Sequence, residues 1–219
     1  MSGPELLLWA RGTGLQIAVA IFLFGLLARF VELWLLGRKT DLSVARASAV
    51  GPGLRTVVSR SLPMPGALKQ TPLVFLGGYV FHLGFLATLL FYVPHIHFLR
   101  SILGFGWPGL PPFLIDVIGL VTIATLIALL VQRFTDPVRR FLSRADDYVA
   151  WTVTFLPLLS GYVAFHRLGT DYTLMLALHI LSVELLLIVI PFTKLMHMFT
   201  FALARWYNGA IAGRKGVRV

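Results

Sequence analysis

The chain contains no cysteine among its 219 residues. It therefore forms no disulfide, no thiolate zinc site, no iron–sulfur cluster and no covalent attachment to c-type haem, since each of these needs a cysteine sulfur. Any redox metal that the chain binds has to be held by histidine, the usual nitrogen ligand for such metals.

Charged residues are also scarce. They make up 13% of the chain, whereas 58% of the residues are hydrophobic, which is too apolar for a soluble domain of this length. Apolar runs long enough to cross a bilayer as helices cover residues 15–36, 73–93, 113–131, 148–165 and 174–204. Because the loops are too short for a second domain, we predict an all-α membrane protein in which residues 1–219 form one domain of five transmembrane helices.

Acidic residues are outnumbered by basic ones, nine against nineteen. The basic residues lie in loops between the apolar runs and form no continuous stripe, which argues against nucleic acid as a partner. Fifteen of them fall on one side of the predicted spans and three on the other. By the positive-inside rule, we expect a multi-pass protein of the cytoplasmic (inner) membrane with its N-terminus outside and its C-terminus in the cytoplasm.

The predicted cytoplasmic loop at residues 37–72 is the only long one. It carries six basic residues, and its glycines and prolines argue against a continuous helix. Two interpretations remain open: the loop is a docking surface for a cytoplasmic partner, or it lies on anionic lipid headgroups.

Two histidines of the fifth run, His179 and His197, are 18 residues apart. On a continuous helix this spacing is five turns, so both side chains would lie on one face at depths that differ by about 27 Å, close to the thickness of the hydrocarbon core. A six-coordinate haem b takes one axial imidazole from each side, usually from different helices. The fifth run therefore offers half of two such sites.

The other half of the inner site is predicted to be His82. It lies in the stretch 77–84 of the second run, whose glycines leave room for a flat macrocycle between helices. We expect His82 to pair with His197.

The partner of His179 is less well defined by the sequence. His95, His166 and His97 all reach about the right depth, and Pro94 prevents extrapolation of the helical phase of the second run. We rank His95 first, then His166 and then His97. For the last two, a hydrogen-bonded or interfacial histidine is an equally good interpretation.

This histidine pattern resembles the gamma subunit of respiratory nitrate reductases, a five-helix membrane cytochrome b with two haems. Segment 178–197, with its two histidines and the Pro-Phe pair between them, is similar to the fifth span of that family, and Phe81-His82-Leu83-Gly84 is similar to its inner-haem motif. The chain departs from the family at Tyr92, where the family has the second histidine of the second span.

The resemblance implies haem b as cofactor, with two haems, or only the one at His82 and His197 as the alternative. It implies electron transfer between the quinone pool and a cytoplasmic iron–sulfur or other redox subunit, as in related membrane subunits of hydrogenase, sulfite-reductase-associated and heterodisulfide-reductase-like complexes. Such a subunit is not catalytic alone on a soluble substrate.

Charged residues within the runs include Glu184, Asp116, Arg29 and Glu32. Glu184 and Asp116 are candidate proton acceptors of a quinone site. The alternative for Glu184 is a hydrogen bond to a neighbouring helix or to a haem-ligating histidine. The alternative for Asp116 is that it anchors the N-terminus of a helix. Arg29 either pairs with Glu32 or meets a propionate of the inner haem. Two competing functions need no haem: a proton-relay transporter or channel subunit, and a passive membrane anchor.

Overall fold

The computed structural model describes residues 2–36, 42, 44–62, 65–169 and 171–217, and these form helices and no strand. Five helices are long and apolar enough to cross a membrane. The prediction of an all-α bundle of five transmembrane helices is therefore confirmed, and the chain is a multi-pass membrane protein. Arg38, Lys39 and Arg218, which contributed to the predicted orientation, lie outside the described residues.

The spans begin and end close to the predicted apolar runs, except for the last. They are α2 (Leu15–Leu36), α5 (Pro72–Phe91), α7 (Pro112–Thr135), α9 (Ala145–Phe165) and α10 (Tyr172–Val189). Proline is the first residue of α5 and of α7, a position where its missing N–H costs no helical hydrogen bond. Shorter helices precede α2 or follow α5 and α7, namely α1 (Gly3–Trp9), α6 (Val93–Leu103) and α8 (Pro137–Leu142).

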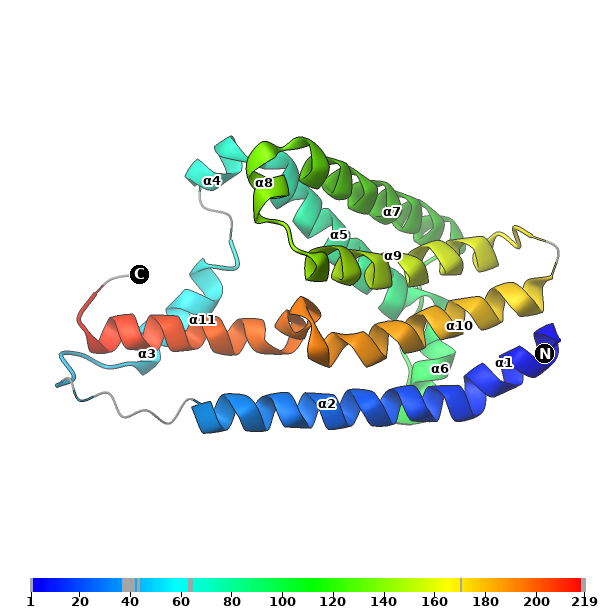
Figure 1. Cartoon of the computed structure of the whole chain (residues 1–219), viewed down its shortest axis with the longest axis horizontal. Coiled ribbons are helices and arrows are strands. Elements are labelled where there is room, and N and C mark those ends of the chain that lie inside the picture. The colour runs from blue at the N-terminus through cyan, green and yellow to red at the C-terminus, as the bar shows by residue number, and fades with distance from the viewer. Residues whose placement is uncertain (1, 37–41, 43, 63–64, 170, 218–219) are drawn as a thin grey trace.

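Helix α10 lies between the two halves of the bundle. It packs against α9 on one side and against α1 and α2 on the other, while α5 packs against α7 (Figure 1). The end of the bundle where α2 and α10 end and α5 and α9 begin is called the basic end below, because the predicted topology places most Lys and Arg residues there.

Side chains in the spans are distributed as a lipid environment requires. Large apolar residues such as Phe24, Leu83 and Phe113 are largely exposed on the outside of the bundle, whereas the buried positions include Ala18 and Thr122. In lipid the hydrophobic effect does not drive helices together. Helices associate instead where small residues allow close packing and where polar side chains form hydrogen bonds. The contacts between spans therefore rest on close packing of small residues.

The fifth span is interrupted, contrary to the prediction of one helix over residues 174–204. After α10, two 3₁₀ turns at Ile190–Phe192 and Lys194–Met196 precede α11 (His197–Arg214). Pro191 has no N–H to continue the helix. The hydroxyl of Thr193 donates to the carbonyl of Val189 over 3.0 Å, and Arg29 Nε donates to the carbonyl of Pro191 over 3.0 Å. These bonds satisfy carbonyls that the break leaves without a helical donor.

The predicted loop at residues 37–72 contains two short helices, α3 (Val50–Ser59) and α4 (Pro65–Gln70). The absence of one continuous helix agrees with the prediction, although Pro52 is accommodated in the first turn of α3. Helix α3 packs along α11, where Gly209 and Gly213 lie against Thr56 and Pro52. Figure 1 shows this helix pair extending beyond the basic end.

The contact between α5 and α7 can be tested at Gly84. A methyl group there would overlap the hydroxyl of Thr122, which is fully buried and donates to the carbonyl of Ile118. We expect Gly84→Ala to lower the free energy of unfolding by about 1–3 kcal/mol, the usual cost of overpacking, as measured by tryptophan fluorescence during thermal unfolding in detergent. Gly119→Ala is the control, because a methyl at Gly119, on α7, meets no atom closer than 3.9 Å. Equal Tm values for Gly84→Ala and the wild type would contradict the close contact.

Candidate functional site

His82 of α5 and His197 of α11 face each other near the basic end. Their ring centroids are 6.1 Å apart, and the ring planes cross at 82°. His82 Nδ1 lies 2.6 Å from the carbonyl oxygen of Gly78, and His197 Nδ1 lies 2.7 Å from that of Lys194. Because a carbonyl only accepts hydrogen bonds, each Nδ1 carries the proton and each Nε2 keeps a free lone pair.

His95 of α6 and His179 of α10 form a second pair. Their centroids are also 6.1 Å apart, and the rings are nearly parallel, at 16°. His95 Nδ1 lies 3.0 Å from the carbonyl oxygen of Thr88, and His179 Nδ1 lies 3.2 Å from the hydroxyl oxygen of Ser160. A side chain at Gly161 would collide with the His179 ring, so this glycine makes room for the imidazole.

Both pairs depend on interruptions of helices. Tyr92 has an extended backbone and Pro94 opens α6, so His95 turns back to a carbonyl seven residues earlier. The break at residues 190–196 similarly sets the position of His197 at the start of α11. The prediction that His179 and His197 share one face of a straight helix was therefore wrong, because the two residues lie on separate helices. The pairing partners that we ranked first nevertheless lie together.

A cavity of about 300 Å³ lies beside the first pair, and both His82 and His197 line it. Apolar side chains of its lining include Val74, Phe81, Leu126, Leu129 and Trp151. Polar and charged side chains of the lining include Gln132, Arg133, Arg139, Asp147 and Lys194. A larger hollow of about 520 Å³ lies over Arg100 and the loop at residues 104–108, and none of the histidines lines it.

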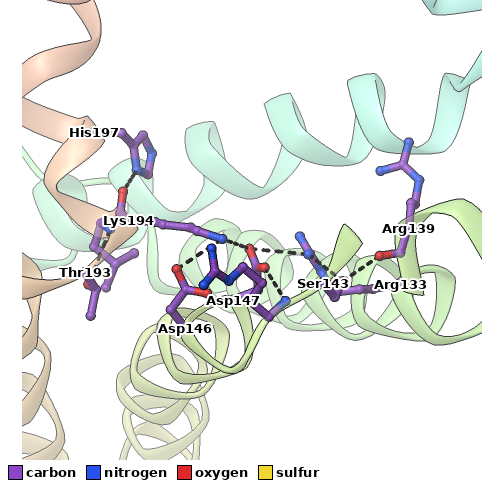
Figure 2. A network of polar contacts seen from close by, with 10 residues as sticks. Arg133, Arg139, Ser143, Asp146, Asp147, Thr193, Lys194 and His197 are labelled. Carbon is purple, nitrogen blue, oxygen red and sulfur yellow. Dashed lines mark hydrogen bonds and ion pairs between the residues drawn. The ribbon is translucent and has the colours of Figure 1, made fainter. Parts of the chain in front are cut away.

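Several polar side chains of the cavity belong to an ion-pair network, shown in Figure 2. Lys194 Nζ lies 2.9 Å from Asp147 Oδ1 and 3.2 Å from Asp146 Oδ2, and Arg133 Nη1 lies 3.4 Å from the same oxygen of Asp147. The hydrogen bond from Lys194 to Asp147 raises the pKa of this lysine. Because the carbonyl of Lys194 accepts from His197, the network ties the start of α9 to the segment that positions His197.

The lower-ranked histidine candidates lie elsewhere. His166 Nε2 is 2.7 Å from Asp116 Oδ1, and both side chains are about one-third exposed, at 31%. His97 is exposed on α6. Neither histidine faces His179, which the structure brings together with His95 instead.

Glu184 is buried in a helix contact, away from both histidine pairs. It is 5% exposed, and its carboxylate lies against Gly14, in the π-helical turn Ala10–Gly14 that joins α1 to α2. Its Oε1 has no hydrogen-bond partner within the described part of the chain. Glu184 therefore packs between α10 and the turn that joins α1 to α2, and it does not lie in an open quinone site.

Arg29 does not line the cavity beside His82 and His197. Its Nη1 pairs with Glu32 Oε2 at 2.5 Å, and its Nε donates to the carbonyl of Pro191. Of the two interpretations of Arg29, the structure shows the pair with Glu32, and it adds a hydrogen bond that stabilises the break in the fifth span.

Several residues of the site were missed by the sequence analysis. Arg133, Arg139 and Lys194 were considered only as markers of topology, and Ser160 was not considered. A possible signal was the position of the two arginines close to the end of an apolar run, at the depth where the inner histidine pair was expected.

Comparison with known proteins gives one family assignment. The chain is 30% identical over 217 residues to a protein of Nitratidesulfovibrio vulgaris (strain Hildenborough), which covers 95% of this chain and 90% of the relative. The chain belongs to that protein's family. The description of the relative, "Protein", states no activity. No family model matches the chain, and no solved structure matches it.

The burial of His95 predicts a pH dependence of stability. Desolvation lowers the pKa of His95 from its ordinary 6.5, against the opposing effect of hydrogen bonds to the carbonyls of Thr88 and Leu89. A depressed pKa means that the unfolded chain takes up the proton first as the pH falls. The stabilisation is therefore complete above the ordinary pKa and is lost as the pH falls through the folded one.

We expect the free energy of unfolding of the cofactor-free chain to decrease between about pH 7 and pH 5.5, where most carboxylates stay ionised. His95→Asn keeps a donor for the Thr88 carbonyl and should flatten this dependence in thermal unfolding experiments. An identical pH profile for the variant and the wild type would assign the effect to other groups.

Proposed function

We propose that the chain is a haem b-binding membrane subunit that passes electrons between the quinone pool and a cytoplasmic iron–sulfur or other redox partner, in the cytoplasmic (inner) membrane. The observation that carries this proposal is the presence of two imidazole pairs, each drawn from two different helical segments and each with ring centroids 6.1 Å apart.

This spacing suits a metal between the rings. Two imidazoles that ligate one metal from opposite sides, through bonds of about 2 Å each, hold their ring centroids roughly 6 Å apart. Two imidazoles are too few for a structural zinc site, which takes four ligands, but they match the two axial positions of a haem. The protonated Nδ1 of His82, His95 and His197 leaves Nε2 as the ligand nitrogen, which is the usual arrangement for metal-bound histidine.

Bound haem would supply reversible one-electron chemistry, with a potential tuned by its surroundings. The chain itself holds the two imidazole pairs at different depths. On α10, eleven residues separate His179 from Ile190 at the break, which corresponds to a rise of about 16 Å. The His82–His197 pair thus lies near the basic end, where the predicted topology puts the cytoplasmic partner. The other pair lies toward the opposite end.

The second pair has a protonatable neighbour. Ring contacts run from His95 to Tyr92 at 5.1 Å, from Tyr92 to Phe165 at 5.6 Å and from Phe165 to His166 at 4.9 Å, and His166 contacts Asp116. A partly exposed imidazole–carboxylate pair can accept a proton from a quinol at the end of the spans. Asp116 with His166 is therefore a better candidate for quinone proton transfer than Glu184, which is packed between helices.

Haem content tests this function directly. We expect the protein purified from haem-replete cells to contain two haems b per chain by pyridine haemochrome assay. Alanine at His82 or His197 removes the inner haem, and alanine at His95 or His179 removes the outer one, so each variant keeps one. His97→Ala is the matched control and should keep both.

The outcomes separate the alternatives. One haem that is lost only on substitution of His82 or His197 would support the single-haem arrangement. A colourless preparation would reject the cytochrome function and favour a proton-relay transporter or channel subunit, or a passive anchor, neither of which needs haem.

The different ring angles predict different spectra for the two sites. The imidazole planes cross at 82° in the His82–His197 pair and at 16° in the His95–His179 pair. In a haem held by two imidazoles, each ring would donate π density to the iron orbital perpendicular to its own plane, so near-parallel rings would split these orbitals more than near-perpendicular rings. The smaller splitting at near-perpendicular rings would give the more anisotropic signal. We expect two low-spin ferric EPR signals, of which the more anisotropic is lost in His82→Ala and the other in His179→Ala. Loss of the same signal in both variants would contradict two separate pairs.

A further inference from the structure

Three cationic side chains line the cavity beside His82 and His197. Arg133 comes from the end of α7, Arg139 from α8 and Lys194 from the break after α10. These side chains line the same cavity as the two imidazoles. Most of the other residues that line this cavity are apolar. The cavity therefore suits a ligand with a flat apolar body and a negatively charged edge.

The cations are held in place by neighbouring groups. Asp147 Oδ1 contacts both Lys194 Nζ, at 2.9 Å, and Arg133 Nη1, at 3.4 Å, and Asp147 Oδ2 accepts from the backbone N–H of Arg144 over 2.9 Å (Figure 2). Arg133 Nη1 also donates to the hydroxyl of Ser143 over 3.0 Å. Because Asp147 is only 13% exposed and is itself fixed by the start of α9, it orients two of the three cations.

Two hydrogen-bonding atoms of residues that line this cavity are unused. Arg139 Nε is buried and has no hydrogen-bond partner among the described residues, since its ion-pair distance to Asp136 Oδ2 is 3.6 Å. Gln132 Oε1 is buried without a partner in the same part of the chain. Leaving a buried charged donor without an acceptor costs more than the bond itself gains. An anionic acceptor in the cavity would remove that cost for Arg139.

We propose that Arg133, Arg139 and Lys194 bind the two propionate carboxylates of the haem whose axial ligands are His82 and His197. This inference rests on the haem proposed above. Arginine binds carboxylates through paired N–H groups, and charge-assisted bonds of this kind are about twice as strong as neutral ones. Arg29 is not part of this assignment, because its side chain pairs with Glu32 and donates a hydrogen bond to the carbonyl of Pro191.

The test compares haem with haem dimethyl ester, which keeps the macrocycle and iron but carries no carboxylate. Apo-protein is prepared from haem-deficient cells in the His179→Ala background, which leaves only the site at His82 and His197; the His95→Ala background serves if His179→Ala does not fold. Binding of each ligand is measured by optical titration in detergent. Hydrogen bonds to charged groups contribute enough that we expect the ester to bind about tenfold to a hundredfold more weakly than haem.

The cations are then removed. In Arg133→Gln, Arg139→Gln and Lys194→Gln, and in the triple variant, the preference for haem over its ester should shrink, and in the triple variant it should disappear. Arg140→Gln is the matched control, because Arg140 lies beside Arg139 on α8 but is exposed and does not line the cavity. The control should keep the full preference. If the triple variant does not fold, the three single variants carry the test.

The possible results distinguish the two proposals. Equal affinity for haem and ester in the background chain that keeps all three cations, or a preference that survives in the triple variant, would overturn the propionate assignment while leaving the haem function intact. Failure of this background chain to bind either ligand would overturn the haem function itself.

Discussion

The hydrogen bond from Arg29 to the carbonyl of Pro191 is the interaction on which the site near the basic end depends. A proline within an apolar span leaves backbone carbonyls without helical donors, and in lipid no water is present to satisfy them. Arg29 supplies a donor from α2, and Thr193 supplies another from within the break. The interruption can therefore persist in the membrane, and it places His197 opposite His82.

The same requirement to satisfy polar groups determines the state of the histidines. An unpaired imidazole is costly in a membrane, and three of the four paired histidines meet this cost by donating from Nδ1 to a backbone carbonyl. The bond fixes both the tautomer and the orientation of the ring. The free Nε2 of these three rings is therefore a consequence of the hydrogen bond at Nδ1, and it is also what a metal needs.

Basic residues at the basic end do more than set the orientation of the chain in the membrane. Arg133, Arg139 and Lys194 belong to the excess of basic residues that predicts which side of the chain faces the cytoplasm. In the folded chain the same side chains line a cavity, and Asp147 at the start of α9 orients Arg133 and Lys194. Residues that set the orientation of a membrane protein can thus also form its binding site.

The sequence by itself determined the five spans, because apolar runs of sufficient length have no other stable environment than the bilayer. It also indicated which histidines could meet, since depth in the membrane follows from position along a span. Only the tertiary structure decided that His95, rather than His166 or His97, faces His179. It also revealed that α10 and α11 are separate helices and that Arg29 stabilises the break between them. The physical reason is that prolines at positions 94 and 191 end the regular helix, and beyond such a break the direction of a side chain depends on hydrogen bonds to other helices and not on helical periodicity.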